Sequence, residues 1–297
     1  MLWIINGLIY GFFTAVYMLF NQHYKINGYV LGIWRGFGIC VFFLPFLFFF
    51  KMPHQWWYWL LLIVQGICIG IYDSHIFFAS AKFGAGPTSR FMSTVVLITS
   101  FAWWALTPQK FYQLLQRSDI LLTLILILCG FSFCYWQMLQ SKISRQAAAY
   151  TMPAVLALAA MSIITKFIAL KSNSLWMGLT YYLTVSTFIS GVYNLCFFVR
   201  QFGVKNLHDV IKPPLPKIGF LLISFSSLLI IAKTMALRIA PNPGYVTALL
   251  LIAPLFIYAL NKHYKISDKI SLKAGLAMLF FLFLLVILIT GNFGVDE

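Results

Sequence analysis

Long apolar stretches alternate with short polar breaks along the 297-residue chain. Crossing the hydrocarbon core of a bilayer takes about 20 predominantly apolar helical residues. Ten windows meet this requirement, at residues 2–20, 29–50, 57–78, 87–107, 118–138, 149–170, 175–199, 216–238, 243–262 and 271–290. The pattern predicts an all-α membrane protein with ten transmembrane helices, because a β-barrel would show short segments of alternating polarity instead.

The breaks between the windows are short, so the sequence leaves no room for a soluble domain. Residues 2–20 are expected to be the first span and not a removed signal peptide, because they lack a basic stretch and a small-residue cleavage site. The composition agrees with a membrane protein. Hydrophobic residues make up 62% of the chain and charged residues 9%, and the mean hydropathy is +0.90, whereas soluble domains are about 25% charged.

The formal net charge of +15 is best explained by loops that face anionic lipid headgroups. Binding to nucleic acid is not expected, because the chain has no basic domain outside the membrane. Calling the face that carries the N-terminus the near side, the loops of the opposite, far side hold twelve basic residues and those of the near side five. The positive-inside rule then makes the far side cytoplasmic.

Chemistry-bearing residues are too few and too scattered for an enzyme. The six acids exclude hydrolases with paired carboxylates and metal cages rich in carboxylates. The five cysteines lie in apolar runs without CxxC spacing, and the five histidines are spread over both faces. We therefore expect neither a cofactor nor a metal site.

Ten windows divide into two sets of five, over residues 1–145 and 146–297. Because five is odd, the second half would be inserted upside down relative to the first, as in many secondary transporters. Placing Lys82 on Arg238 also superposes Pro87 on Pro243, each at the start of the fourth window of its half. The similar segments 21–26 and 261–266 do not superpose in this alignment of the two halves. Their similarity is therefore a coincidence, or both segments belong to a basic rim on the same membrane face.

Several short motifs occur in the order and at the spacing of one transporter family. They are Tyr10-Gly11, Arg35, Ala81-Lys82-Phe83-Gly84-Ala85, Ala236-Leu237-Arg238-Ile239-Ala240-Pro241 and Pro254. With them the chain resembles the EamA-type branch of the drug/metabolite transporter superfamily over nearly its whole length. The resemblance implies a transporter with a central cavity lined by helices one to four and six to nine, with helices five and ten at the periphery. It also implies cytoplasmic termini, in conflict with the loop charges.

Four cations and one acid lie inside the predicted spans. A charge at a helix centre costs about 2.5–3.5 kcal/mol on insertion scales, so each needs water, a partner or a ligand. Arg35 in the second window and Asp73 in the third lie at similar depth from the far side. We therefore predict that Arg35 and Asp73 form a buried ion pair.

Arg90, Lys166 and Lys233 have no acidic partner in the sequence pattern. Either these cations extend to the lipid headgroups, or they attract an anionic substrate from both mouths of the protein. Ser89, Ser93 and Ser100 share one helix face, which suits interhelical hydrogen bonds and substrate contact equally. The candidate substrate-binding residues are Arg35, Asp73, Arg90, Lys166, Lys233, Trp34, Tyr10, Tyr17, Ser93 and Tyr245.

The sequence thus predicts a secondary transporter that moves a small polar metabolite, anionic or zwitterionic, such as an amino acid or an organic acid. Its partners would be that small molecule and the lipid bilayer, and its expected location is the bacterial inner membrane. The alternatives are an exporter of hydrophobic drugs, a membrane-embedded lipid-modifying enzyme and a channel. A role with cationic drugs is disfavoured because Arg35 would occupy the one membrane carboxylate, Asp73.

Overall fold

The computed structural model describes residues 2–109, 112, 116–140, 142–240, 242–266 and 271–293, with side chains as far as residue 288. Within these residues every regular element is helical. The first half contains α1 (Leu2–Tyr24), α2 (Gly28–Phe43), η1 (Leu44–Phe49), α3 (Trp56–Phe83), α4 (Ala85–Met92), α5 (Val95–Leu106) and α7 (Ser118–Met138). The second contains α8 (Lys142–Lys171), α9 (Leu175–Tyr181), η2 (Tyr182–Ser186), α10 (Thr187–Phe202), η3 (Val204–Ile211), α11 (Leu215–Ile239), α12 (Pro243–Leu249), α13 (Ile252–His263) and α14 (Leu272–Phe293).

Eight segments of the described chain are long and apolar enough to cross a membrane, so the chain is a multi-pass integral membrane protein. The expected number was ten. The segments are Leu2–Tyr24, Gly28–Phe49, Trp56–Phe83, Ser118–Met138, Lys142–Lys171, Leu175–Phe202, Leu215–Ile239 and Pro243–His263. The predicted window 87–107 is not one of the eight long spans, because it is divided between α4 and α5. The predicted window 271–290 contributes only a shorter apolar segment, Leu272–Leu288.

Two helices are interrupted halfway across, between α4 and α5 and between α12 and α13. At the first interruption the hydroxyls of Ser93 and Thr94 donate to the carbonyls of Ser89 and Phe91, at 3.1 and 2.7 Å. Such bonds compete with the regular backbone pattern. At the second, Pro254 follows Leu250 by four residues, where its ring cannot donate to the Leu250 carbonyl and crowds it. Local chemistry therefore explains both breaks.

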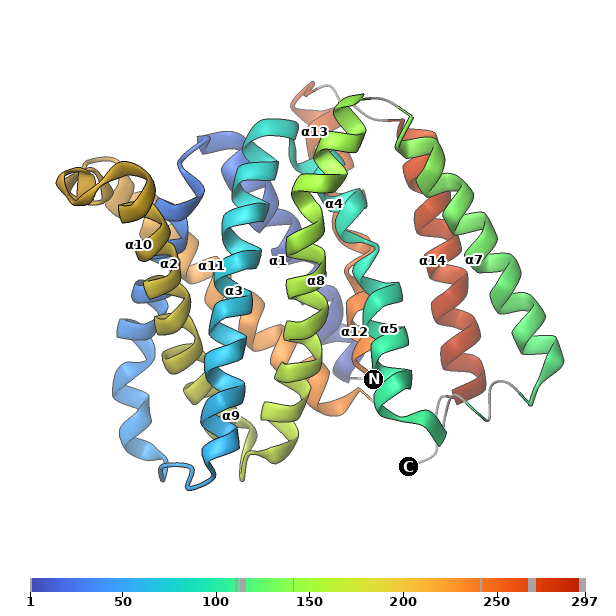
Figure 1. Ribbon diagram of the computed structural model, residues 1–297, viewed down its shortest axis with the longest axis horizontal. Coiled ribbons are helices and arrows are strands. Elements are labelled where there is room, and N and C mark those ends of the chain that lie inside the picture. The colour runs from blue at the N-terminus through green and yellow to red at the C-terminus, as the bar shows by residue number, and fades with distance from the viewer. Residues whose placement is uncertain are drawn as a thin grey trace.

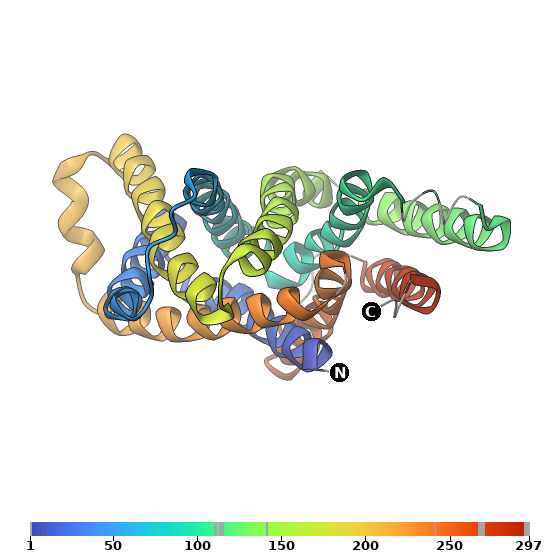
Figure 2. The ribbon, with the colours of Figure 1, turned by 90° about the horizontal axis from the view of Figure 1, so that it is seen from below.

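The helices form two layers, as the view from below shows (Figure 2). One layer contains α10, α3, α8, the α4–α5 pair and α7, and the other contains α2, α11, α1, the α12–α13 pair and α14. The backbones of α2 and α10 approach closely because glycines face each other. A Cβ atom added at Gly36 would lie 2.5 Å from the Cα atom of Gly191, so no side chain fits there.

α7 and α14 pack on each other at one end of the molecule (Figures 1 and 2). They correspond to the fifth and tenth predicted windows, and their peripheral position is the one that the family resemblance implies. Most of their outward-facing side chains are large and apolar, which suits contact with lipid. The remaining helices are therefore the ones that surround the interior of the protein.

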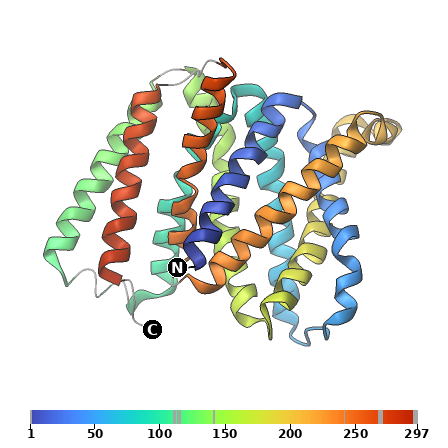
Figure 3. The ribbon, with the colours of Figure 1, turned by 180° about the vertical axis from the view of Figure 1, so that it is seen from behind.

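The similar segments 21–26 and 261–266 form matching helix ends. α1 and α13 pack together and end at the same edge of the molecule (Figure 3). Beyond each end a lysine takes a left-handed conformation, with φ of 51° at Lys25 and 56° at Lys265. A residue of this conformation commonly terminates a helix. The repeated sequence is thus a shared terminating signal, placed on the far side next to its copy.

An amide on α1 connects three helices at this far edge. The Gln22 Oε1 atom accepts a hydrogen bond of 2.6 Å from the backbone N–H of Ala85, the first residue of α4. The Gln22 Nε2 atom donates to Asn261 Oδ1 on α13 at 2.8 Å. Through this one side chain the end of α1 holds the start of α4 beside the end of α13.

The start of α1 and the end of α14 lie at the same lower edge of the molecule (Figure 1). Because the far-side loops hold twelve basic residues against five, we expect this near edge to face outward. A membrane-impermeant maleimide should therefore label a single cysteine in an added C-terminal tag on intact cells, above the background of the untagged protein. Labelling only after permeabilisation would contradict the charge argument and favour the cytoplasmic termini that the resemblance implies.

Candidate functional site

The predicted ion pair is present in the interior of the bundle. Arg35 on α2 donates from Nη1 to Oδ2 of Asp73 on α3. The hydroxyl of Tyr17 on α1 donates to the other carboxylate oxygen, Oδ1, at 2.7 Å. The side chains of Arg35 and Asp73 are 2% and 0% exposed. The pair is thus fully buried, and the prediction made from the depths of the two residues is confirmed.

A second cation lies beside this pair. The Nζ atom of Lys233 on α11 is 5.9 Å from the centre of the Tyr10 ring, and the lysine is close enough to Arg35 for the two charges to repel. Lys233 is 1% exposed. Within the described part of the chain, neither its Nζ atom nor the Nε atom of Arg35 has a hydrogen-bond partner.

Two further tyrosines complete the group, and the sequence reasoning missed both. The ring of Tyr72 on α3 stacks on that of Tyr17, with centroids 6.2 Å apart. Tyr182 begins η2, a π-helical turn, and interacts electrostatically with Arg35. Such turns occur frequently at functional sites. We call the seven side chains the polar cluster: Tyr10, Tyr17, Arg35, Tyr72, Asp73, Tyr182 and Lys233.

The run of hydroxyl residues between Thr180 and Thr187, at the middle of a span, is the sequence signal that could have pointed to Tyr182. Next to it, the amide Nε2 of Gln65 donates to Thr165 Oγ1 at 2.9 Å and joins α3 to α8. The polar cluster therefore continues into a buried hydrogen bond that connects α3 to one further helix, α8.

The structure places Lys166 and Arg90 away from the polar cluster. The Nζ atom of Lys166 donates to the carbonyls of Leu237, at 3.0 Å, and of Ala240, at the end of α11. Arg90 donates to the carbonyls of Gly86, at 3.2 Å, and of Ser271, at 3.3 Å. The bonds of Lys166 satisfy carbonyls at the C-terminal end of α11, and the bond from Arg90 to Ser271 joins α4 to the segment just before α14, so both residues have evident structural roles.

The remaining three predicted residues are dispersed. Trp34 donates from Nε1 to the Val210 carbonyl at 2.7 Å, which attaches α2 to η3. Tyr245 lies against Trp3, with ring centroids 6.3 Å apart. Ser93 lines a cavity of about 10 Å³ between the two helix interruptions, roughly the space of a single water. Of the ten candidates, the structure brings together Tyr10, Tyr17, Arg35, Asp73 and Lys233.

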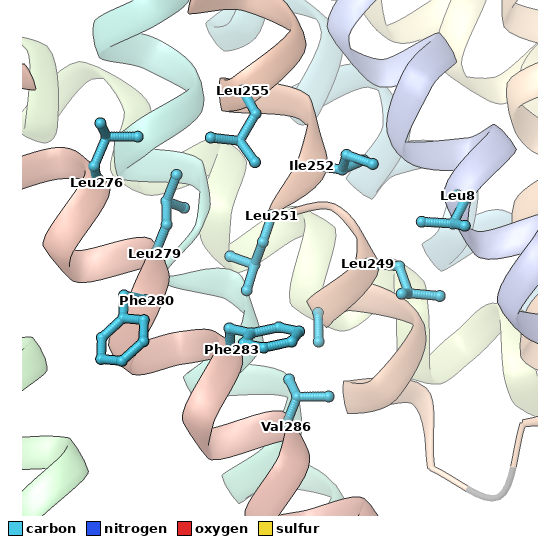
Figure 4. Close-up of a pocket in the computed structure, with 11 residues that line it drawn as sticks. Leu8, Leu249, Leu251, Ile252, Leu255, Leu276, Leu279, Phe280, Phe283 and Val286 are labelled. Atoms are coloured by element: carbon cyan, nitrogen blue, oxygen red, sulfur yellow. The ribbon is translucent and has the colours of Figure 1, made fainter.

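A separate groove of about 430 Å³ lies between α1, the α12–α13 pair and α14 (Figure 4). Its lining side chains are all apolar: Leu8, Ala248, Leu249, Leu251, Ile252, Leu255, Leu276, Leu279, Phe280, Phe283 and Val286. Binding sites for polar molecules need a few well-placed polar groups to orient the ligand. The groove has none, so the polar cluster is the better candidate site for a polar substrate.

Comparison with models of known protein families finds no match for this chain, and comparison with curated proteins finds no significant relative.

Proposed function

We propose that the chain is a secondary transporter of a small polar metabolite, anionic or zwitterionic, that works by alternating access in the inner membrane of a bacterium. The observation that carries the proposal is the polar cluster. Ionisable residues inside a membrane protein are costly, and they commonly mark the path of a substrate or ion. Here five helical elements from both halves of the chain, α1, α2, α3, η2 and α11, contribute to one buried charged group.

The architecture supports the proposal. The α4–α5 pair runs from the upper to the lower edge and α14 runs in the same direction (Figure 1), so with the eight long spans they would make ten crossings. In the register that places Lys82 on Arg238, the interruption at 93–94 corresponds to 249–250. The second interruption lies one residue away, at Leu250–Leu251.

The packing of the interrupted helices also fits an inverted repeat. α4 packs against α13 and α5 against α12, as expected of two antiparallel helices that are broken at the same depth. Discontinuous helices of this kind form the substrate sites of several transporter folds. The resemblance to EamA-type transporters points the same way.

Transport by the purified protein in liposomes tests the proposal. Vesicles loaded with a mixture of unlabelled organic acids and amino acids should take up labelled members of that mixture faster than vesicles loaded with buffer. Protein-free vesicles measure leakage, and vesicles with the Lys171→Met variant, which removes an exposed charge, serve as a matched control. If no labelled compound enters faster than in protein-free vesicles, the proposal is wrong.

A further inference from the structure

The charges of the polar cluster restrict the substrate further, on the basis of the proposed function. Asp73 is the only acidic residue away from the ends of the predicted spans. With Arg35 and Lys233 both protonated, the cluster has two positive charges and one negative charge, a net charge of +1. Lys166 and Arg90 are held by backbone carbonyls elsewhere and are not counted.

The hydrogen bonds show where a ligand charge would be received. Both oxygens of Asp73 are engaged, Oδ1 by Tyr17 and Oδ2 by Arg35. By contrast, the Nζ atom of Lys233 and the Nε atom of Arg35 are donors without an acceptor in the part of the chain described. A buried donor left without an acceptor is costly. The cluster therefore lacks negative charge, and its one carboxylate is already paired with Arg35.

We infer that the substrate is a small monoanion, a monocarboxylate, whose carboxylate is received by Lys233. One negative charge neutralises the cluster and supplies the missing acceptor. A second carboxylate of a dianion has no further cation in the cluster. The ammonium of an amino acid has no free counter-charge there, because the carboxylate of Asp73 is already paired with Arg35. The rings of Tyr10, Tyr72 and Tyr182 offer apolar faces to the rest of the molecule.

Ligands that differ only in charge test this inference on the purified, full-length protein. One aliphatic set is butyrate, succinate, 4-aminobutyrate, butyramide and butylamine. An aromatic set is benzoate, terephthalate, 4-(aminomethyl)benzoate, benzamide and benzylamine. Dissociation constants follow from the dependence of the melting temperature on ligand concentration. In at least one set the monocarboxylate should bind at least 10-fold more tightly than its four counterparts. The inference is overturned if another charge type binds most tightly, or if neither monocarboxylate binds.

Variants at two buried lysines separate a binding role from a structural one. Lys233→Met should weaken binding of the preferred monocarboxylate at least 10-fold, and Lys233→Arg should retain most of it. Lys233→Met should also raise the melting temperature of the empty protein, because it removes a buried charge that lacks an acceptor. Lys166→Met should keep the affinity within about 2-fold and lower the melting temperature, because it removes bonds to carbonyls. A structural Lys233 would show the opposite pattern, with a lower melting temperature and unchanged affinity.

Different experimental results would contradict the monocarboxylate inference and the proposed transport function. If the liposomes transport dicarboxylates or amino acids, the chain is a transporter and the monocarboxylate inference is wrong. If butyrate or benzoate binds through Lys233 but no compound crosses the membrane, the site is correct and the transport function is wrong. The ligand sets are tested on the unmodified protein, so the result does not depend on the folding of any variant.

Discussion

Asp73→Asn is expected to destabilise the protein by about 3–5 kcal/mol, as found when one partner of a buried ion pair is removed. Asparagine leaves the guanidinium of Arg35 buried without a negative charge and replaces one acceptor oxygen by a donor. Reversible unfolding in mixed detergent–SDS micelles, followed by circular dichroism, measures the change.

Asp119→Asn is the matched control for this experiment. Asp119 is also paired with an arginine, Arg117, at 3.7 Å, but its side chain is 73% exposed. Exposed pairs contribute about 0–1 kcal/mol, so this change should have little effect. In the double variant Arg35→Met with Asp73→Leu, much of the lost stability should return, because neither charge is then left alone. Equal stability of Asp73→Asn and the unmodified protein would contradict the burial of the pair.

Lys166→Met should lower the free energy of unfolding by about 1.5–3 kcal/mol, the range for hydrogen bonds to a charged group. The side chain is 4% exposed, and its ammonium satisfies the carbonyls of Leu237 and Ala240 where α11 ends. Its positive charge also lies at the negative end of that helix. Methionine has a similar length but no donor, so the carbonyls lose these bonds inside the protein.

The same unfolding experiment measures the effect, with Lys171→Met as control, because Lys171 ends the same helix and is exposed. That control should change the free energy of unfolding by less than about 0.5 kcal/mol. If Lys166→Met is as stable as the control, then the bonds to α11 contribute little.

The sequence predicted the membrane class and the ion pair because both depend on strong, local signals. Apolar length is visible in any hydropathy pattern, and the only acid well inside a span needs a cation at its own depth. The interruption at Leu250–Leu251 was not predicted, because both residues are apolar and hydropathy does not register a missing hydrogen bond. Pro254 lies four residues later, and hydropathy does not register the effect of a proline on the preceding turn.

The site was harder to predict, because the sequence indicates how deep in the membrane a residue lies but not which way its side chain points. Lys166 and Lys233 have similar depths and similar apolar surroundings in the sequence. They differ only in what surrounds them: Lys166 bonds to the end of α11, whereas Lys233 lies over the ring of Tyr10 and near enough to Arg35 for electrostatic repulsion. Tyr182 was missed because its position follows from a π-helical turn, which a regular helical period does not anticipate.

The amide of Gln22 has a consequence for the equilibrium between joined and separated arrangements of α4 and α13. A motion that separates α4 from α13 at the far edge has to break at least one of its two bonds, to Ala85 or to Asn261. At about 0.5–1.5 kcal/mol for one such bond, the amide favours the arrangement in which α4 and α13 stay joined by roughly 2- to 12-fold in population. If the chain works by the proposed alternating access, this single polar residue at the end of α1 would hold the far side closed, and the strength of its bonds would set how often that side opens.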